Sequence, residues 1–177
     1  MCLNIAEIRD HVSKLGTSIS APISYLNIPD RPVSDGTPYI EIINKEYHYV
    51  STERGMEISR KITHDVDELL YWIFKRVASA MASTYEFQNR VDGCDSRRKK
   101  FAKQIEIMEK LNPKWGHLMQ DEIEKILKNS PYDDFSDDRV KLCKKLMDKG
   151  LSGEQAYEKA CEKFPLPVLS TRPNQKE

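Results

Sequence analysis

The N-terminal part of the chain combines one short amphipathic segment with a long proline-rich one. Residues 4–15 place four aliphatic side chains at helical spacing, and this spacing predicts a helix capped by Asn4 and ended by Gly16. Residues 17–38 contain four prolines among serines and aspartates. Because proline lacks a backbone donor and favours extended neighbours, this segment is predicted to be a long connecting loop.

The pattern changes to that of a β-sheet over residues 38–63. Residues 39–43 and 47–50 are rich in β-branched and aromatic side chains, and apolar residues alternate again from Met56 to Ile62. The intervening "NKE" and the stretch around Gly55 are typical of turns. These features predict a three-stranded antiparallel meander, which needs a cover on at least one face.

Helical periodicity follows the strands. One apolar stripe runs from Val66 to Thr84 behind a D-x-x-E start at Asp65, a second helix ends before Pro113, and a third runs from about Gly116 to Pro131. Strands and helices in separate blocks indicate the α+β class, with the meander packed against a helical bundle.

The C-terminal part is predicted to be a helical hairpin. Its first helix is predicted to be capped by Ser136 and ended by Gly150, and its second begins at Ser152 with Gln155 in capping-box spacing. We therefore divide the chain into an α+β domain over residues 1–130, a hairpin over 131–164 and a mobile tail over 165–177.

Charge and composition narrow the function. The chain has 177 residues with 28 basic and 28 acidic side chains, so it lacks the basic excess typical of nucleic-acid or membrane-surface binders. No apolar stretch approaches the ~20 residues of a membrane span, and the N-terminus has no signal-peptide core. We predict a cytoplasmic protein that does not act at a membrane and has nucleic acid as an unlikely partner.

Catalytic and metal-binding signatures are absent from the sequence. The four cysteines contain no C-x-x-C pair, and no P-loop, G-x-S-x-G elbow, dinucleotide fingerprint or H-E-x-x-H motif occurs. We predict reduced thiols, no metal, no cofactor and no enzymatic activity. A hydrolase centred on Glu53 and Glu86 is retained as an alternative.

The run "CDSRRKKF" at residues 94–101 places cations at a predicted helix start, where the helix dipole disfavours them. One interpretation is a structural ion-pair network that satisfies the arginines with carboxylates. The candidates for this network are Glu53, Arg54, Glu86, Asp92, Asp95, Arg97 and Arg98. The alternative is an anion- or nucleic-acid-binding module that uses residues 97–100.

Three motifs in chain order carry a resemblance to a known family. They are the E-R-G turn in "YVSTERGMEI" (49–58), the helix "DELLYWIF" (67–74), and the D-x-R-R-x-x-F helix start followed by a tryptophan in "YEFQNRVDGCDSRRKKFAKQIEIMEKLNPKW" (85–115). Together they resemble the Immunity protein 63 family of bacterial polymorphic toxin systems over roughly residues 39–125. The resemblance implies a small cytoplasmic protein, encoded beside a toxin, that binds and neutralises the toxin domain.

Two groups of residues are candidates for such a toxin interface. One interpretation of the aromatic residues is that they fill the core, as expected for Tyr71, Trp72 and Phe74 of the predicted helix. The other is that Tyr39, Tyr47, His48 and Tyr49 on the predicted sheet supply an exposed aromatic patch, and aromatic residues dominate interface energetics. The segment "DDFSDD" is either a solvated helix start or an acidic surface suited to a basic toxin. Its candidates are Asp133, Asp134, Asp137 and Asp138.

Overall fold

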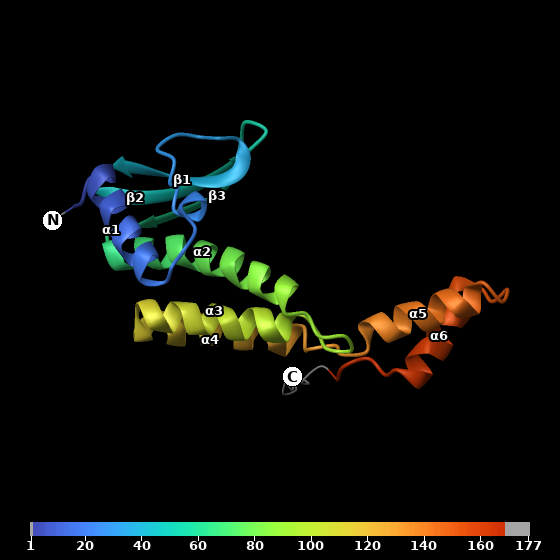
Figure 1. Cartoon of the computed structure of the whole chain (residues 1–177). Coiled ribbons are helices and arrows are strands. Elements are labelled where there is room, and N and C mark those ends of the chain that lie inside the picture. Colours follow the sequence, from blue (N-terminus) through green and yellow to red (C-terminus); the bar gives the residue numbers. More distant parts are fainter. Residues whose placement is uncertain (1, 169–177) are drawn as a thin grey trace, which may run out of the picture. The chain divides into compact units, whose positions relative to one another are not determined.

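The computed structural model of this chain describes residues 2–168 and confirms the α+β class. No helix among these residues is both long and apolar enough to cross a bilayer. The elements in chain order (Figure 1) are α1 (Ile5–Ser18), a 3-10 helix η1 (Ile23–Tyr25), β1 (Asp35–Ile43), β2 (Glu46–Glu53), β3 (Met56–Thr63), α2 (Val66–Gln88), α3 (Arg97–Leu111), α4 (Pro113–Asn129), α5 (Ser136–Met147) and α6 (Gly153–Lys163).

The chain divides into two compact units. The first contains the chain up to Met81 together with Glu106–Gly116, and the second contains Ala82–Ile105 and the chain from His117 onward. Helices α2, α3 and α4 therefore each contribute residues to both units. The predicted domain boundary near residue 130 concerns which parts of the chain fold independently, which this division into compact units does not test. It therefore stays a prediction.

The predicted meander is confirmed as one antiparallel sheet with strand order β1-β2-β3. Each hairpin turns through two residues with positive φ, Asn44 and Lys45 in the first (50° and 66°) and Arg54 and Gly55 in the second (50° and 80°). Such turns match the right-handed twist of the flanking strands. The register shifts between Asp35 and Pro38 in the β1–β2 pair, and between Ser51 and Thr52 in the β2–β3 pair, where it forms a β-bulge near the second turn.

The N-terminal helix and the loop after it pack in the first unit. Asn4 and Glu7 form a capping box at the start of α1, as the sequence predicts. Gly16, however, does not end the helix, because α1 continues to Ser18. Gly16 is instead buried where a Cβ atom would collide with the side chain of Leu26, so its role is to allow close approach of the loop.

The core of the first unit is aromatic. On α2, Tyr71 and Phe74 are buried, and both contact Trp115, with ring centroids 6.3 and 6.0 Å apart. Trp72 lies beside Tyr49 of β2 at a centroid distance of 6.3 Å, which places α2 against one face of the sheet. The core-filling interpretation of these aromatic residues is therefore the correct one.

Two helix starts differ from the sequence prediction. Helix α4 begins at Pro113 rather than near Gly116, because proline is favoured in the first helical turn, where its missing N–H has no partner to lose. Ser136 is the first residue of α5 and makes no capping hydrogen bond, since the cap position is taken by Phe135. The predicted capping box of Ser152 and Gln155 does form at α6.

Helices α5 and α6 lie against each other as the predicted hairpin in the second unit (Figure 1). Ala156 and Ala160 of α6 are fully buried. The predicted mobile tail begins at residue 165, and its residues 169–177 lie outside the described part of the chain. Its mobility stays a prediction.

Candidate functional site

The basic run at residues 97–100 begins α3, and a carboxylate from the preceding loop meets it. Asp95 accepts the backbone N–H of Arg97 at 2.9 Å and also binds its guanidinium, with 2.6 Å between Arg97 Nη2 and Asp95 Oδ2. A further donor, the backbone N–H of Asp133, reaches the same carboxylate at 2.8 Å. Asp95 thereby offsets the cost of placing a cation at the positive end of the helix dipole.

A second carboxylate makes the reciprocal connection. Asp134 accepts the backbone N–H of Asp95 at 2.8 Å and binds Arg98 in a bidentate manner, at 2.9 Å to Nε and 2.8 Å to Nη2. Asp95 and Asp134 therefore each hold an arginine side chain and a backbone amide of the opposite loop. We call the loops 92–96 and 130–134, joined by these bonds, the aspartate clamp.

The arginine side chains extend the aspartate clamp. Arg97 also donates to the carbonyl oxygens of Ser130 and Pro131, at 2.9 and 2.7 Å. The guanidinium of Arg98 lies over the ring of Tyr132, 4.3 Å from the centroid, in cation–π geometry. All of these contacts lie within the second unit and fix the start of α3 to the loop between α4 and α5.

Arg139 of α5 attaches the C-terminal hairpin to the same loop. Its side chain is buried, donates to the carboxylate of Asp133, and also donates to the carbonyls of Phe164 and Pro165 at 3.1 and 2.9 Å. Because a buried guanidinium needs partners for its donors, these bonds hold the segment after α6 against α5.

The electrostatics of the clamp favour ionised carboxylates. Burial by itself raises the pKa of Asp95, but hydrogen bonds from the Arg97 side chain and from two backbone amides outweigh it and lower this pKa to about 2. The Arg98 guanidinium, together with the backbone N–H of Asp95, holds the pKa of Asp134 below its ordinary value. These carboxylates are therefore ionised at neutral pH.

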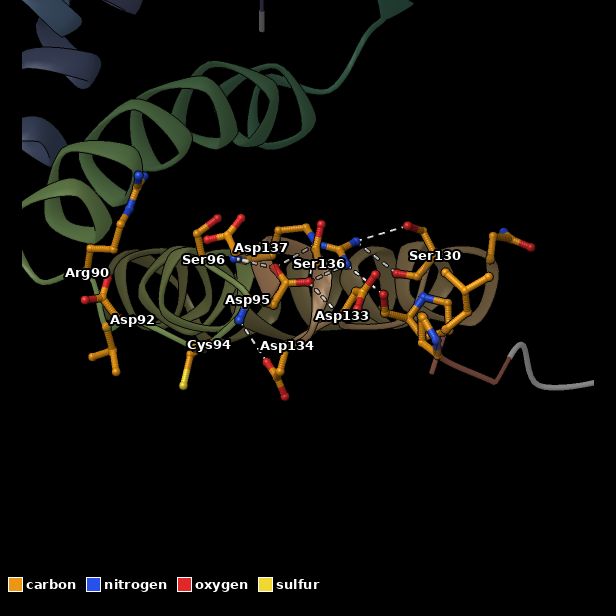
Figure 2. Close-up of a pocket in the computed structure, with 17 residues that line it drawn as sticks. Arg90, Asp92, Cys94, Asp95, Ser96, Ser130, Asp133, Asp134, Ser136 and Asp137 are labelled. Carbon is orange, nitrogen blue, oxygen red and sulfur yellow. Dashed lines mark hydrogen bonds and ion pairs between the residues drawn. The ribbon is translucent and has the colours of Figure 1, made fainter. Parts of the chain in front are cut away.

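An open cavity of about 690 Å³ lies beside the clamp (Figure 2). Five aspartates contribute to its wall against two arginines, so its lining is acidic. Asp95, Asp133 and Asp134 gather at its centre in Figure 2, whereas Arg90 and Asp92 lie toward one end. Asp137, from the first turn of α5, is exposed at the cavity.

The structure brings together only part of the predicted network. Asp95, Arg97 and Arg98 meet as described, and Glu86 pairs separately with Arg90 at 2.8 Å. Within residues 2–168, Glu53, Arg54 and Asp92 form no ion pair. The predicted partners of Arg98 were wrong because its partner, Asp134, lies 36 residues away and was assigned to the toxin surface.

The same contacts weigh against the two alternative functions. The guanidinium groups of Arg97 and Arg98 are engaged by carboxylates, so neither presents an open anion site. Lys99 donates to the carbonyl of Asn89, and Lys100 is half-buried. For a hydrolase, Glu86 is poorly suited as a general acid, because hydrogen bonding to Arg90 lowers its pKa.

The predicted exposed aromatic patch does not form. Tyr47 is 1% exposed, and its hydroxyl oxygen accepts the N–H of Leu3 at 2.7 Å. His48 is also buried, and Tyr49 is half-buried beside Trp72. The sequence pattern predicts that these residues lie in a strand, but only the folded unit shows that their side chains are covered. Whether they affect toxin binding stays a prediction.

A polar cluster occupies the sheet face that carries His48. Arg60 of β3 binds Glu57 in a bidentate manner, at 3.0 and 2.7 Å, and reaches Glu41 of β1 at 3.2 Å. Its Nη1 atom also lies 2.8 Å from Nδ1 of His48. The Arg60 side chain therefore lies back across β2, away from the free edge of β3.

Several residues of the aspartate clamp, and Arg139 that binds to it, were not predicted from the sequence. Ser130, Pro131 and Tyr132 contribute through carbonyl oxygens or a ring face, which no motif marks. Arg139 follows two aspartates in α5 and resembles an ordinary surface residue in the pattern. In the sequence, the only sign of the clamp was Asp95, which lies two residues before Arg97 in the predicted loop.

Among residues 2–168 the four cysteines are free thiols, and no group of side chains is arranged to hold a metal.

Comparisons with known proteins give one match. The model of the family Immunity protein 63 matches residues 44–125, which run from the first hairpin turn to within α4. No curated protein and no solved structure matches the chain. The aspartate clamp draws one of its two loops from the matched segment and the other from the part beyond it. Over residues 44–125 the chain matches the Immunity protein 63 family, as its motifs predict.

Proposed function

We propose that this protein is an immunity protein that binds the toxin domain encoded beside its gene and neutralises it in a one-to-one complex without turnover. The observation that carries this proposal is the match of residues 44–125 to the Immunity protein 63 family. Self-protection against a lethal partner requires nearly complete occupancy at low concentration. The complex is therefore expected to have a Kd of about 1 nM or less, which corresponds to about −12 kcal/mol or better.

The acidic cavity of the second unit supports a basic toxin as the partner. Asp137 and Asp138 in the first turn of α5 make no ion pair within the described residues, and Asp137 is exposed. Asp133 and Asp134 stabilise the fold, because they bind Arg139 and Arg98. Asp137, which lines the cavity, and its neighbour Asp138 are thus the carboxylates best placed to steer a basic partner, because neither is engaged in an ion pair among the described residues.

The pairing of the carboxylates supports inhibition by binding rather than by chemistry. Glu86, Asp95 and Asp134 each bind an arginine, and each has its pKa lowered. Perturbed groups of this kind act as structural anions, whereas a general acid needs a raised pKa.

The test is a titration of the purified toxin domain with this protein, with residual toxin activity and complex mass measured together. We expect inhibition to be complete at one equivalent, with a one-to-one complex. Protection by much less than one equivalent would indicate enzymatic inactivation. The absence of a complex at micromolar concentration would refute the proposal.

The steering residues have a matched control. The double variant Asp137→Asn/Asp138→Asn should lower the association rate and its salt dependence while the dissociation rate changes little. The control Glu154→Gln/Glu158→Gln removes the same charge from α6, outside the cavity lining. Equal effects of the two double variants would mean that net charge, and not the acidic cavity, attracts the toxin.

A further inference from the structure

Among residues 2–168, no strand pairs with the outer edge of β3. The sheet order β1-β2-β3 places β3 at one side, and residues 56–62 are all exposed. Exposed aliphatic side chains accompany this edge, with Ile58 at 56% and Ile62 at 50% exposure. Long edge strands with apolar side chains are templates for strand addition.

The register identifies which main-chain groups point outward. The N–H of Ile40 donates to the carbonyl of Pro29, which lies on the side of β1 away from β2. Ile40 is opposite Tyr49, so this pair is not hydrogen-bonded and the main chain of Tyr49 points toward β3. Lys61 is paired with Tyr49, so the N–H and C=O groups of Lys61 point toward β2. The N–H and C=O groups of its neighbours Arg60 and Ile62 therefore point outward, away from the sheet.

The two basic side chains of residues 60 and 61 lie over the faces of the sheet and not along its outer edge. The guanidinium of Arg60 is drawn across the sheet to Glu41 and His48. The ammonium of Lys61 lies over the ring of Trp72, 5.3 Å from its centroid, on the other face. The bulge between Ser51 and Thr52 limits regular pairing to residues 59–63, toward the α2 end of the strand.

The side chains of residues 59–63 indicate which kind of strand could pair with this edge. A second copy of this chain, paired antiparallel about a two-fold axis, must place one residue opposite itself. The register that pairs all of residues 59–63 would place Lys61 against Lys61, and like charges directly opposite are destabilising. Registers centred on Arg60 or on Ile62 would pair only residues 59–61 or 61–63. A foreign strand with an acidic side chain beside Lys61 and an aliphatic one beside Ile62 avoids this cost and gains a favourable pair.

We propose that the outer edge of β3, at residues 59–63, pairs with an extended segment of the toxin domain that alternates acidic and aliphatic side chains. This inference rests on the proposed function, because it names the surface through which that complex forms. The outward main-chain groups of Arg60 and Ile62 supply affinity, and Lys61 and Ile62 select the sequence of the segment.

Amide hydrogen exchange of the wild-type protein, followed by NMR, tests the pairing directly. In the free protein we expect the amides of Arg60 and Ile62 to exchange rapidly and the inward amide of Lys61 to be protected. Addition of one equivalent of the purified toxin domain should slow exchange at Arg60 and Ile62 by at least about tenfold. A complex that leaves both amides fast would overturn the inference and leave the proposed function standing, whereas absence of any complex would refute both.

Variants at Ile62 separate the main chain from the side chain. Ile62→Pro removes the outward N–H together with the isoleucine side chain, breaks no hydrogen bond to β2 and is tolerated at a strand edge, so it should weaken toxin binding roughly 10- to 100-fold. Ile62→Thr keeps the N–H and the β-branched shape and should weaken binding less. Equal affinities of wild type and Ile62→Pro, with unchanged urea midpoints, would overturn the inference. Concentration-dependent protection of Arg60 and Ile62 without toxin would instead assign the edge to a second copy.

Discussion

Replacing the central carboxylate of the aspartate clamp with a neutral amide should destabilise the second unit in a pH-dependent way. The perturbation is Asp95→Asn, which keeps the shape of the side chain and removes its charge. The Asp95 side chain is 9% exposed, so water can replace little of what is lost. The amide also presents a donor toward Arg97 or the N–H of Asp133, where the carboxylate presents only acceptors.

The magnitude follows from the pKa of Asp95. A pKa of about 2 in the folded protein, against 3.8 ordinarily, corresponds to roughly 2.5 kcal/mol of stability at neutral pH. Because the folded pKa is the lower of the two, this stability is present above pH 3.8 and is lost as the pH falls toward 2. About half of the contribution should remain at pH 3.

The assay is urea unfolding of wild type and Asp95→Asn at pH 7, 5, 4 and 3, followed by far-UV circular dichroism. Both tryptophans, Trp72 and Trp115, belong to the first unit, so tryptophan fluorescence would report mainly on the wrong part of the chain. We expect the difference in unfolding free energy to be about 2 to 3 kcal/mol at pH 7 and to shrink as the pH is lowered.

Asp92→Asn is the matched control, because Asp92 lies in the same loop, is exposed and forms no ion pair within the described residues. This control should change stability little at any pH. A deficit of Asp95→Asn that is the same at pH 7 and pH 3 would show that the lost stability comes from shape or packing. An equal deficit in Asp92→Asn would show that the clamp is not its source.

Two further predictions concern the core and the basic run. Trp115→Ala should cost about 3 to 5 kcal/mol in urea unfolding followed by circular dichroism, because Trp115 is 3% exposed between Tyr71 and Phe74; a loss below about 1 kcal/mol would mean that this cluster is not the core. Arg98→Ala should lower the urea midpoint more than Lys100→Ala, because only Arg98 binds a carboxylate of the opposite loop. Equal, negligible shifts in the two variants, together with nucleic-acid binding that weakens steeply with salt, would revive the anion-binding interpretation.

Local sequence features were sufficient to predict most elements. Alternation of apolar residues placed three strands, the helical stripe after Asp65 placed α2, and capping residues located the starts of α1 and α6. Each of these signals depends on residues within a few positions of one another, where backbone geometry alone relates side-chain spacing to structure. The family motifs are local for the same reason, and the match over residues 44–125 follows them.

Tertiary structure decided the partners and the exposure of the side chains. Asp134 reads as a surface carboxylate in the sequence, and only folding brings it to Arg98 and to the N–H of Asp95. Tyr47 reads as a possible interface residue, yet its hydroxyl binds Leu3, 44 residues away. Spacing along the chain determines which face of an element a residue occupies, whereas burial and pairing depend on what packs on that face. That information resides in contacts between distant segments, so the aspartate clamp and the open edge of β3 became visible only in the folded chain.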